Sequence, residues 1–309
     1  MTDYKNLIKL SAIASMVKDE FRGKEYWDIE KCSAAYGLAK VCPEGCRACI
    51  FRPNSKGVVA RPKFLLSEKE FIKDAKRKAL MGARNYKIVA PIRGLDNPAL
   101  LKKAVRIIKS IRKEVPQIKQ ICASLGLLTK EAARALRDAG VSEYNHNLES
   151  GRSYFDSTRY SLRHTYKDKI DTIINAYEAG MGICSGILVG EGEKMSDRIE
   201  LFSTIRDLKN GKGKIIIDSS PFNIFVPVTL EHVANKRISA EEILMSLCMF
   251  RIMCPNVKIL PNAGRAYFSD YLALTYFIAD GRSIHGAYLT KGVTEKQDKK
   301  IMEIIKKTI

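Results

Sequence analysis

The amino-acid sequence predicts an α/β fold, namely a (β/α)8 barrel of the TIM type with an N-terminal helical extension. Eight short apolar runs alternate with longer amphipathic stretches, which is typical of parallel strands joined by helices. A length of 309 residues is normal for one such barrel. No low-complexity linker interrupts the pattern, so we expect one domain over 1–309. Within it we expect the helical extension at 1–32, the barrel at 33–292 and a C-terminal helix at 293–309.

The individual elements follow from local patterns. The strand candidates are short apolar runs, and they lie at 35–42, 86–92, 118–125, 141–148, 182–190, 214–226, 256–263 and 283–290. The helix candidates carry apolar residues at three- and four-residue intervals, and they lie at 67–83, 97–115, 129–141, 167–181, 196–208 and 239–255. Ser67 with Glu70 matches a capping box, Thr129 is an N-cap candidate, and Gly140 is a C-cap candidate.

Composition narrows the class of protein. The formal net charge of +19 fits either an anionic partner or a lysine-rich surface. Basic residues are scattered over several helix candidates without interleaved aromatics, so we favour the surface and expect no nucleic-acid function. No run of about 18 apolar residues occurs and charges interrupt the N-terminus, so we expect neither a membrane span nor a signal peptide. Eight cysteines, three of them clustered, suit a reducing cytoplasm better than a disulfide framework.

Three cysteines, Cys42, Cys46 and Cys49, follow the first strand candidate in the spacing CxxxCxxC. Three thiolates in one short loop can bind three irons of a cubane cluster and leave the fourth iron open to a small molecule. Iron–sulfur clusters are normally held by four cysteines, so a three-cysteine loop predicts a [4Fe-4S] cluster built for chemistry. The alternatives are a zinc site, for which no fourth Cys or His follows nearby, and buried free thiols.

Other polar residues collect where the predicted strands end, which is where barrel enzymes place their active sites. In the run EYNHNLES the alternating residues Asn145, Asn147 and Glu149 point to one face of a strand. An alternative for the two asparagines is backbone capping at the strand end. Such a gathering of polar groups favours a polar ligand, and the substrate-side candidates are Cys122, Cys184, Asn223, Asn262 and Arg265.

The cysteine spacing resembles the signature of the radical S-adenosylmethionine (SAM) enzymes, and from the triad to about Gly292 the chain resembles biotin synthase and its relatives. The runs CPEGC, ICASLGLLTKEAARALRDAGVSEYNHNLES, TYKDKIDTIINAYEAGMGICSGILVGEGE and PNAGR carry this resemblance. It implies a barrel that encloses SAM and substrate. It also implies a cluster whose open iron binds SAM, so that reductive cleavage gives methionine and a 5′-deoxyadenosyl radical.

The resemblance also implies roles for individual residues. Cys42, Cys46 and Cys49 match the cluster ligands, and Asn147 and Glu149 match positions that contact the ribose or methionine part of SAM. The run GILVGEGE fits a GxIxGxxE pattern that packs beside the adenine. The further cofactor-binding candidates are Asn145, Arg163, His164, Gly186, Leu188, Gly190 and Glu193.

Three departures from that family pattern stand out. Ala48 replaces an aromatic residue that usually touches adenine, and His164 stands where an arginine is usual, beside Arg163. Biotin synthase also holds an auxiliary two-iron cluster on three cysteines and an arginine. In this chain Cys122 and Cys184 match two of those cysteine positions. The third cysteine position, on the second strand, is occupied by Ile88 or Val89, and the arginine position falls near Leu260. Cys122 and Cys184 are then either packing residues of the barrel wall or substrate contacts.

These observations predict a radical SAM enzyme of cofactor biosynthesis that acts on a small substrate enclosed in the barrel. Among sulfur-independent relatives we favour biosynthesis of the iron-guanylylpyridinol cofactor of iron-only hydrogenase, on family analogy and a Lys/Ile-rich composition. The alternatives are sulfur insertion, as in biotin or archaeal lipoyl synthesis, and a non-catalytic SAM-binding iron–sulfur scaffold. We expect an electron donor of the ferredoxin or flavodoxin type, and the oligomeric state stays open, a homodimer included.

Overall fold

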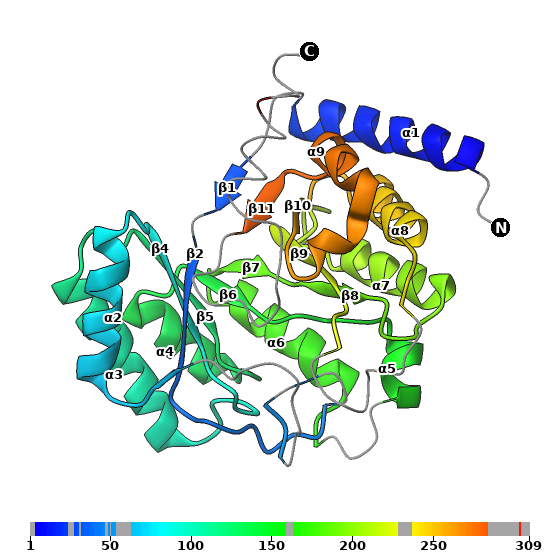
Figure 1. The fold of residues 1–309 in the computed structure, drawn as a ribbon. Coiled ribbons are helices and arrows are strands. Elements are labelled where there is room, and N and C mark those ends of the chain that lie inside the picture. The colour runs from blue at the N-terminus through cyan, green and yellow to red at the C-terminus, as the bar shows by residue number, and fades with distance from the viewer. Residues whose placement is uncertain are drawn as a thin grey trace.

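Parallel strands flanked by helices make up most of the chain in the computed structural model (Figure 1). The structure describes residues 4–23, 28–30, 32–46, 49, 51–53, 63–158, 163–227, 237–283 and 303. The strands are β1 (Asp28–Glu30), β2 (Cys32–Gly37), β3 (Phe64–Leu65), β4 (Asn85–Val89), β5 (Gln120–Ser124), β6 (Glu143–Asn145), β7 (Gly182–Cys184), β8 (Ile187–Val189), β9 (Ser219–Ile224), β10 (Lys258–Pro261) and β11 (Gly281–Ser283).

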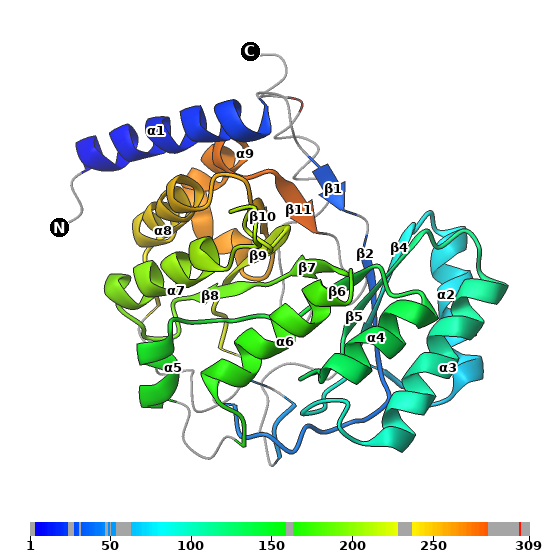
Figure 2. The same cartoon turned by 180° about the vertical axis from the view of Figure 1, so that it is seen from behind.

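The helices alternate with these strands as the sequence predicts. They are α1 (Tyr4–Arg22), α2 (Glu68–Leu80), α3 (Pro98–Glu114), α4 (Lys130–Ala139), α5 (Arg152–Thr158), α6 (Tyr166–Glu178), α7 (Met195–Asp207), α8 (Ala240–Met253), the 3-10 helix η2 (Arg265–Leu274) and α9 (Thr275–Ile278). Helices α2, α3, α4 and α6 lie along the outer side of the strands (Figure 2). In the described part of the chain, no helix is both long and apolar enough to cross a membrane.

The sheet follows the order β10-β9-β7-β6-β5-β4-β2-β3, with β8 paired to β9, and all of its strand pairs are parallel. Strand β11 pairs with β1 in a separate two-stranded sheet. The two sheets meet where the Asp280 N–H donates to the Ile259 carbonyl, 2.9 Å away. Parallel strands joined by helices confirm the predicted α/β barrel fold class, although hydrogen bonds among the described residues do not close the main sheet into a ring.

Several predicted boundaries are wrong by a few residues. The first strand starts earlier than predicted and stops at Gly37, because Leu38 has a left-handed φ of 66°. The predicted strand 182–190 is two strands, β7 and β8, and the extension 1–32 contains β1 as well as a helix. The sequence analysis did not predict α5, η2 or α9. The last predicted strand, 283–290, lies outside the described residues except for Ser283, as does the C-terminal helix 293–309 except for residue 303.

The predicted helix caps are confirmed. Ser67 accepts from the Glu70 N–H while the Glu70 carboxylate accepts from the Ser67 N–H, which is the capping box. Thr129 accepts from the Ala132 N–H at the start of α4. Gly140 ends that helix with φ 109°, a conformation that costs little only for glycine.

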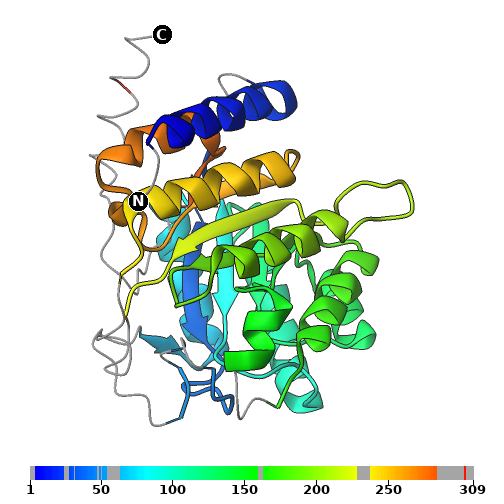
Figure 3. The same ribbon diagram turned by 90° about the vertical axis from the view of Figure 1, so that its right-hand side faces the viewer.

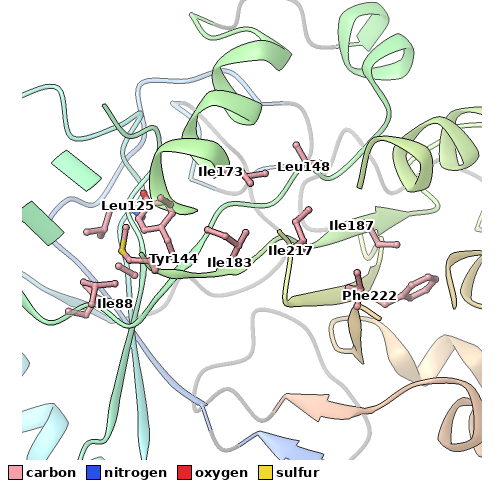
Figure 4. Packing of buried hydrophobic residues seen from close by; sticks show 14 of the residues in the cluster. Ile88, Leu125, Tyr144, Leu148, Ile173, Ile183, Ile187, Ile217 and Phe222 are labelled. Carbon is pink, nitrogen blue, oxygen red and sulfur yellow. Dashed lines mark hydrogen bonds between the residues drawn. The ribbon is translucent and has the colours of Figure 1, made fainter. Parts of the chain in front are cut away.

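The core lies between the strands and the helices around them. Its buried side chains include Ile88, Leu125, Tyr144, Leu148, Ile173, Ile183, Ile187, Ile217 and Phe222 (Figure 4). Strand residues alternate between this layer and the barrel interior. On β4 the Tyr86 hydroxyl donates to Asp74 on α2, 2.8 Å away, so Tyr86 faces the helices. Its neighbour Lys87 therefore faces the interior.

The N-terminal helix α1 packs against α8 and forms an ion pair with Asp280, both in the C-terminal third of the chain. Helix α1 packs along α8 (Figure 3). At its end, the Arg22 Nε donates to the Asp280 carboxylate, 2.9 Å away, and Arg251 of α8 pairs with the same carboxylate. Asp280 also accepts from the Ile259 N–H at 2.7 Å. One buried carboxylate therefore joins α1, α8 and β10.

Replacing this carboxylate should destabilise the protein strongly. Arg251 and Asp280 are both fully buried, so Asp280→Ala leaves an uncompensated buried cation. We expect the free energy of unfolding to fall by about 3–5 kcal/mol. Glu114→Ala, which breaks an exposed ion pair with Lys76, is the matched control and should cost at most about 1 kcal/mol. Denaturant unfolding of the apoprotein measures both, and equal losses would contradict the role assigned to Asp280.

Candidate active site at the strand ends

The cysteine loop, residues 42–49, follows β2 as the sequence predicts. Cys42, Cys46 and Cys49 are all partly buried and form no disulfide among the described residues. The Cys42 N–H donates to the Phe51 carbonyl at 2.8 Å, and the Cys49 N–H donates to the Cys46 carbonyl at 3.0 Å. The Phe51 N–H in turn donates to the Cys49 sulfur at 3.4 Å. These bonds fold the loop back on itself and hold the three thiols in one short turn.

The electrostatics of this loop disfavour free thiolates. Burial above all, together with the charges of Cys46, Cys42 and Glu149, raises the pKa of Cys49 to about 12. Burial also raises the pKa of Cys42 to about 11. Three soft sulfur donors that repel one another as anions fit a cationic iron–sulfur group, which neutralises them. In the part of the chain that the structure describes, no three His, Cys, Asp or Glu side chains are grouped as ligands of a metal ion.

A chain of hydrogen bonds runs along the end of β6, and we call Asn145, Asn147 and Glu149 the β6 row. The Asn145 amide donates to Asn147 Oδ1 at 2.8 Å, and the Asn147 amide donates to Glu149 Oε1 at 3.0 Å. The predicted alternation onto one face is therefore confirmed. Glu149 has φ 69°, a left-handed conformation that is uncommon for a non-glycine residue and often marks a functional site.

Gly186, between β7 and β8, packs directly against this row. Its N–H donates to Asn147 Oδ1 at 2.8 Å, and its carbonyl accepts from the Glu149 N–H at 3.1 Å. A Cβ added at Gly186 would stand 2.7 Å from Asn147 Oδ1, closer than real Cβ contacts. The Leu188 N–H donates to the Glu149 carbonyl at 2.8 Å. The row and the GILVG segment thus form one backbone-linked unit.

The carboxylate of Glu193 shapes its own loop. It accepts from the backbone N–H groups of Gly190, Glu191 and Gly192 at 2.6, 2.8 and 3.1 Å. Arg198 donates to it at 2.6 Å and also pairs with Glu242 on α8. Because these donors occupy both oxygens, Glu193 holds the turn after β8 in place, and Gly190 in that turn has φ 94°.

The sequence analysis missed a buried carboxylate in the cysteine loop. Glu44 accepts from the Arg163 N–H at 2.9 Å and contacts His164 Nδ1 at 3.1 Å. Arg163 and His164 precede α6, so the structure brings these two predicted cofactor-binding residues to the cysteine loop. The only sequence signal for Glu44 was an acidic residue between two cysteines.

Cys122 and Cys184 lie inside the barrel, 5% and 6% exposed. The Asn145 amide donates to the Cys184 carbonyl at 3.1 Å and contacts its sulfur at 3.3 Å. In the β4–β5 ladder the residue level with Cys122 is Lys87, which is 9% exposed. Ile88, expected at this second-strand position, packs in the core toward the helices, while Val89 is level with Ser124. The neighbour of Cys122 in the barrel interior is therefore a lysine, which the sequence analysis missed.

The remaining substrate candidates gather at the ends of β9 and β10. Asn223 Oδ1 accepts from the Ala263 N–H at 3.3 Å, and the Asn262 N–H donates to the Phe222 carbonyl at 3.0 Å. The Arg265 N–H donates to the Asn262 carbonyl at 3.4 Å, and its side chain is buried. Asn223 thus holds the turn that carries Arg265 into η2.

Comparison with known proteins defines the class to which this fold and site belong. Residues 37–205 match the family model of the radical SAM superfamily, and residues 221–307 match the biotin and thiamin synthesis associated domain. The chain belongs to the radical SAM superfamily.

Within that superfamily the chain is a biotin-synthase-like protein. It is 32% identical over 305 residues to the biotin synthase of Thermotoga petrophila, covering 96% of this chain and 97% of that protein. The biotin synthase of Carboxydothermus hydrogenoformans is 31% identical over 288 residues, covering 92% of this chain and 84% of that protein.

Two solved structures share the fold. The FeFe-hydrogenase maturase HydG from Carboxydothermus hydrogenoformans superposes with a TM-score of 0.78 at 20% identity, covering 100% of this chain and 72% of that one. Methylornithine synthase, PylB, superposes with a TM-score of 0.71 at 16% identity, covering 100% of this chain and 89% of that one. At these identities the likeness concerns the fold alone.

Family membership makes this chain a radical SAM enzyme, with a [4Fe-4S] cluster and SAM as its cofactors. Enzymes of this superfamily act on small molecules and take an electron from a donor. The soft, mutually repelling thiols of the cysteine loop fit the cluster, and the hydrogen-bonding groups of the β6 row fit a polar cofactor.

Gly186→Ala should disturb the β6 row and weaken SAM binding. The added Cβ displaces Asn147, which the resemblance assigns to SAM, and losing a buried hydrogen bond costs about 1–3 kcal/mol. We expect the SAM dissociation constant of reconstituted protein, measured by calorimetry, to rise about ten-fold or more. Gly211→Ala is the control, because its Cβ meets no atom within 4 Å. An unchanged affinity in Gly186→Ala would contradict the assignment of Asn147.

Proposed function

We propose that this radical SAM enzyme holds a single [4Fe-4S] cluster on Cys42, Cys46 and Cys49 and binds SAM between the cysteine loop and the β6 row. One observation carries the proposal. Glu44 of the cysteine loop contacts His164 at 3.1 Å, and Lys169, which lies over the Phe155 ring beside His164, donates to the Leu148 carbonyl next to Glu149, so the loop and the row lie near each other. These two segments are about 100 residues apart in sequence, and the strand order of the barrel brings them together.

The chain's own residues then bind and orient the cofactor. Glu149 and Asn147 offer a carboxylate and an amide, which suit the hydroxyl and ammonium donors of a ribose and a methionine. The segment with Gly186, Leu188 and Gly190 lines the same side through its backbone. When bound, the reduced cluster supplies the electron that cleaves SAM to methionine and a 5′-deoxyadenosyl radical.

Within this class we infer a reaction that makes or rearranges carbon bonds on a small substrate enclosed in the barrel, without sulfur insertion. Lys87 supports this inference, because it is level with Cys122, and an ammonium group has donors only and cannot bind iron.

Our favoured pathway is biosynthesis of the iron-guanylylpyridinol cofactor of [Fe]-hydrogenase, on sequence resemblance. Sulfur insertion, as in biotin or archaeal lipoyl synthesis, is the second candidate, because the relatives are biotin synthases and Cys122 and Cys184 are retained. A scaffold that binds SAM without turning it over would form no 5′-deoxyadenosine.

Partners and location follow from the same chemistry. We propose that a ferredoxin or flavodoxin supplies the electron and that the protein acts in a reducing cytoplasm, which keeps its thiols free to bind iron. We propose no nucleic-acid or membrane partner, since the net charge of +19 is spread over many helices.

Replacing Cys42, Cys46 and Cys49 by alanine should abolish formation of 5′-deoxyadenosine in the presence of dithionite and SAM. The fold should survive, because the loop contributes little to the main core. Iron content and the EPR spectrum of the reduced protein measure the cluster, and circular dichroism measures the fold. A triple variant that keeps a redox-active four-iron cluster would overturn the ligand assignment.

Reconstituted protein should hold about four irons per chain, the number that one cubane contains. Among the cysteines whose side chains the structure describes, Cys122 and Cys184 are the two that face the barrel interior, and two thiolates leave a two-iron cluster half unligated. The double variant Cys122→Ala, Cys184→Ala should therefore keep the same iron count. Mössbauer spectra that show a second cluster in the wild type, lost in the double variant, would favour sulfur insertion instead.

A further inference from the structure

Glu44 links the cysteine loop to the segment before α6, and the proposed function requires the loop to be held at a fixed place relative to the β6 row. It lies between Cys42 and Cys46, and its side chain is 3% exposed. Its Oε2 atom accepts from the Arg163 N–H and contacts the ring of His164. One residue of the cysteine loop is thus bonded to the segment that leads into α6, about 120 residues further along the chain.

His164 is held from its other side by an aromatic platform. Its ring lies 5.8 Å from that of Phe155, which contacts the Tyr166 ring at 5.5 Å and the Lys169 ammonium at 5.4 Å. Tyr166 donates to the Ser150 carbonyl at 3.0 Å, and Lys169 donates to the Leu148 carbonyl at 2.8 Å. Leu148 and Ser150 flank Glu149. A continuous set of contacts therefore runs from Glu44 to the backbone on both sides of Glu149.

The second carboxylate oxygen of Glu44, Oε1, argues against a purely structural role for this residue. Glu44 Oε1 is buried, and none of the residues that the structure describes donates a hydrogen bond to it. Folding alone does not favour such an arrangement, because a buried acceptor without a donor loses its hydration and gains nothing in return. An unmet acceptor beside two of the proposed cluster ligands is what a site built for an incoming hydrogen-bond donor leaves behind.

We propose that Glu44 is a positioning residue that sets the distance and orientation between the cysteine loop and the β6 row. It acts through His164 and the Phe155 platform, so that the cluster and SAM are held together rather than separately. The inference rests on the proposed function, since it presupposes a cluster on the loop and SAM at the row. It predicts that SAM affinity depends on Glu44 even when the cluster is fully assembled.

The test uses Glu44→Ala and Glu44→Gln with Glu178→Gln, an exposed carboxylate of α6 paired with Lys130, as the matched control. Four quantities are measured: iron per chain, the SAM dissociation constant, the change in the EPR signal of the reduced cluster on adding SAM, and hydrogen exchange of the Arg163 amide in the apoprotein. The amide exchange reports the Glu44 contact without any cofactor. A further double-mutant cycle combines Glu44→Ala with His164→Ala.

We expect Glu44→Ala to keep its iron, to bind SAM at least ten-fold more weakly, to lose the SAM-induced EPR change and to exchange the Arg163 amide faster. Glu44→Gln keeps an acceptor oxygen and should recover part of the affinity. The effects of Glu44→Ala and His164→Ala should not add, because the two residues act through one contact. Glu178→Gln should match the wild type throughout.

Two results would overturn the inference. One is Glu44→Ala with intact iron and wild-type SAM affinity, and the other is loss of iron in both Glu44 variants, which would make Glu44 a support of the loop only. A wild-type protein that assembles no cluster, or that binds no SAM, would instead refute the proposed function, and the inference with it. Iron and SAM measurements on the wild type therefore separate the two failures.

Discussion

The hydrogen-bonded β6 row, from Asn145 through Asn147 to Glu149, is the constraint on which the rest of the site depends. Polar side chains at the mouth of a barrel are costly unless each is paired, and here they pair with one another and with the Gly186 N–H. The left-handed backbone of Glu149 costs about 1–3 kcal/mol, which the surrounding bonds must offset. In return, its carboxylate is held at one place within reach of Cys49.

The interior below this row bears on which reaction we propose for this barrel. Strand pairing fixes which residues share a level, so one substitution changes the chemistry of that level without altering the fold. Lys87 places a cationic side chain beside Cys122, and its charge also lowers the pKa of Tyr36, although burial raises that pKa overall. The Tyr36 ring lies tilted against the ring of Phe51, just after the cysteine loop, with centroids 5.8 Å apart. The charge of Lys87 is therefore felt by a residue that packs beside the cysteine loop.

The sequence was sufficient to predict the fold class and the shared face of the β6 row, because these follow from local patterns. Periodicity gave the alternating strands and helices, and period-two geometry predicted that Asn147 and Glu149 share a face. Periodicity could not predict the break between β7 and β8, where Gly186 closely approaches Asn147. Nor could it give the bonds of Glu193, a cofactor-binding candidate whose carboxylate accepts from its own loop and from Arg198. Glu44 and Lys87 were missed, because their partners or neighbours come from distant segments and only tertiary structure shows them.

Electron–nuclear double resonance on reduced wild-type protein tests the central claim most directly. The claim is that SAM lies between the cysteine loop and the β6 row, with its amino-acid end at the open iron of a single cluster. SAM labelled with ¹⁵N at its α-amino group should give a hyperfine coupling to the reduced cluster, and the Glu149→Ala variant should lose most of that signal at the same SAM concentration. A wild-type spectrum with no ¹⁵N coupling at saturating SAM would contradict the account.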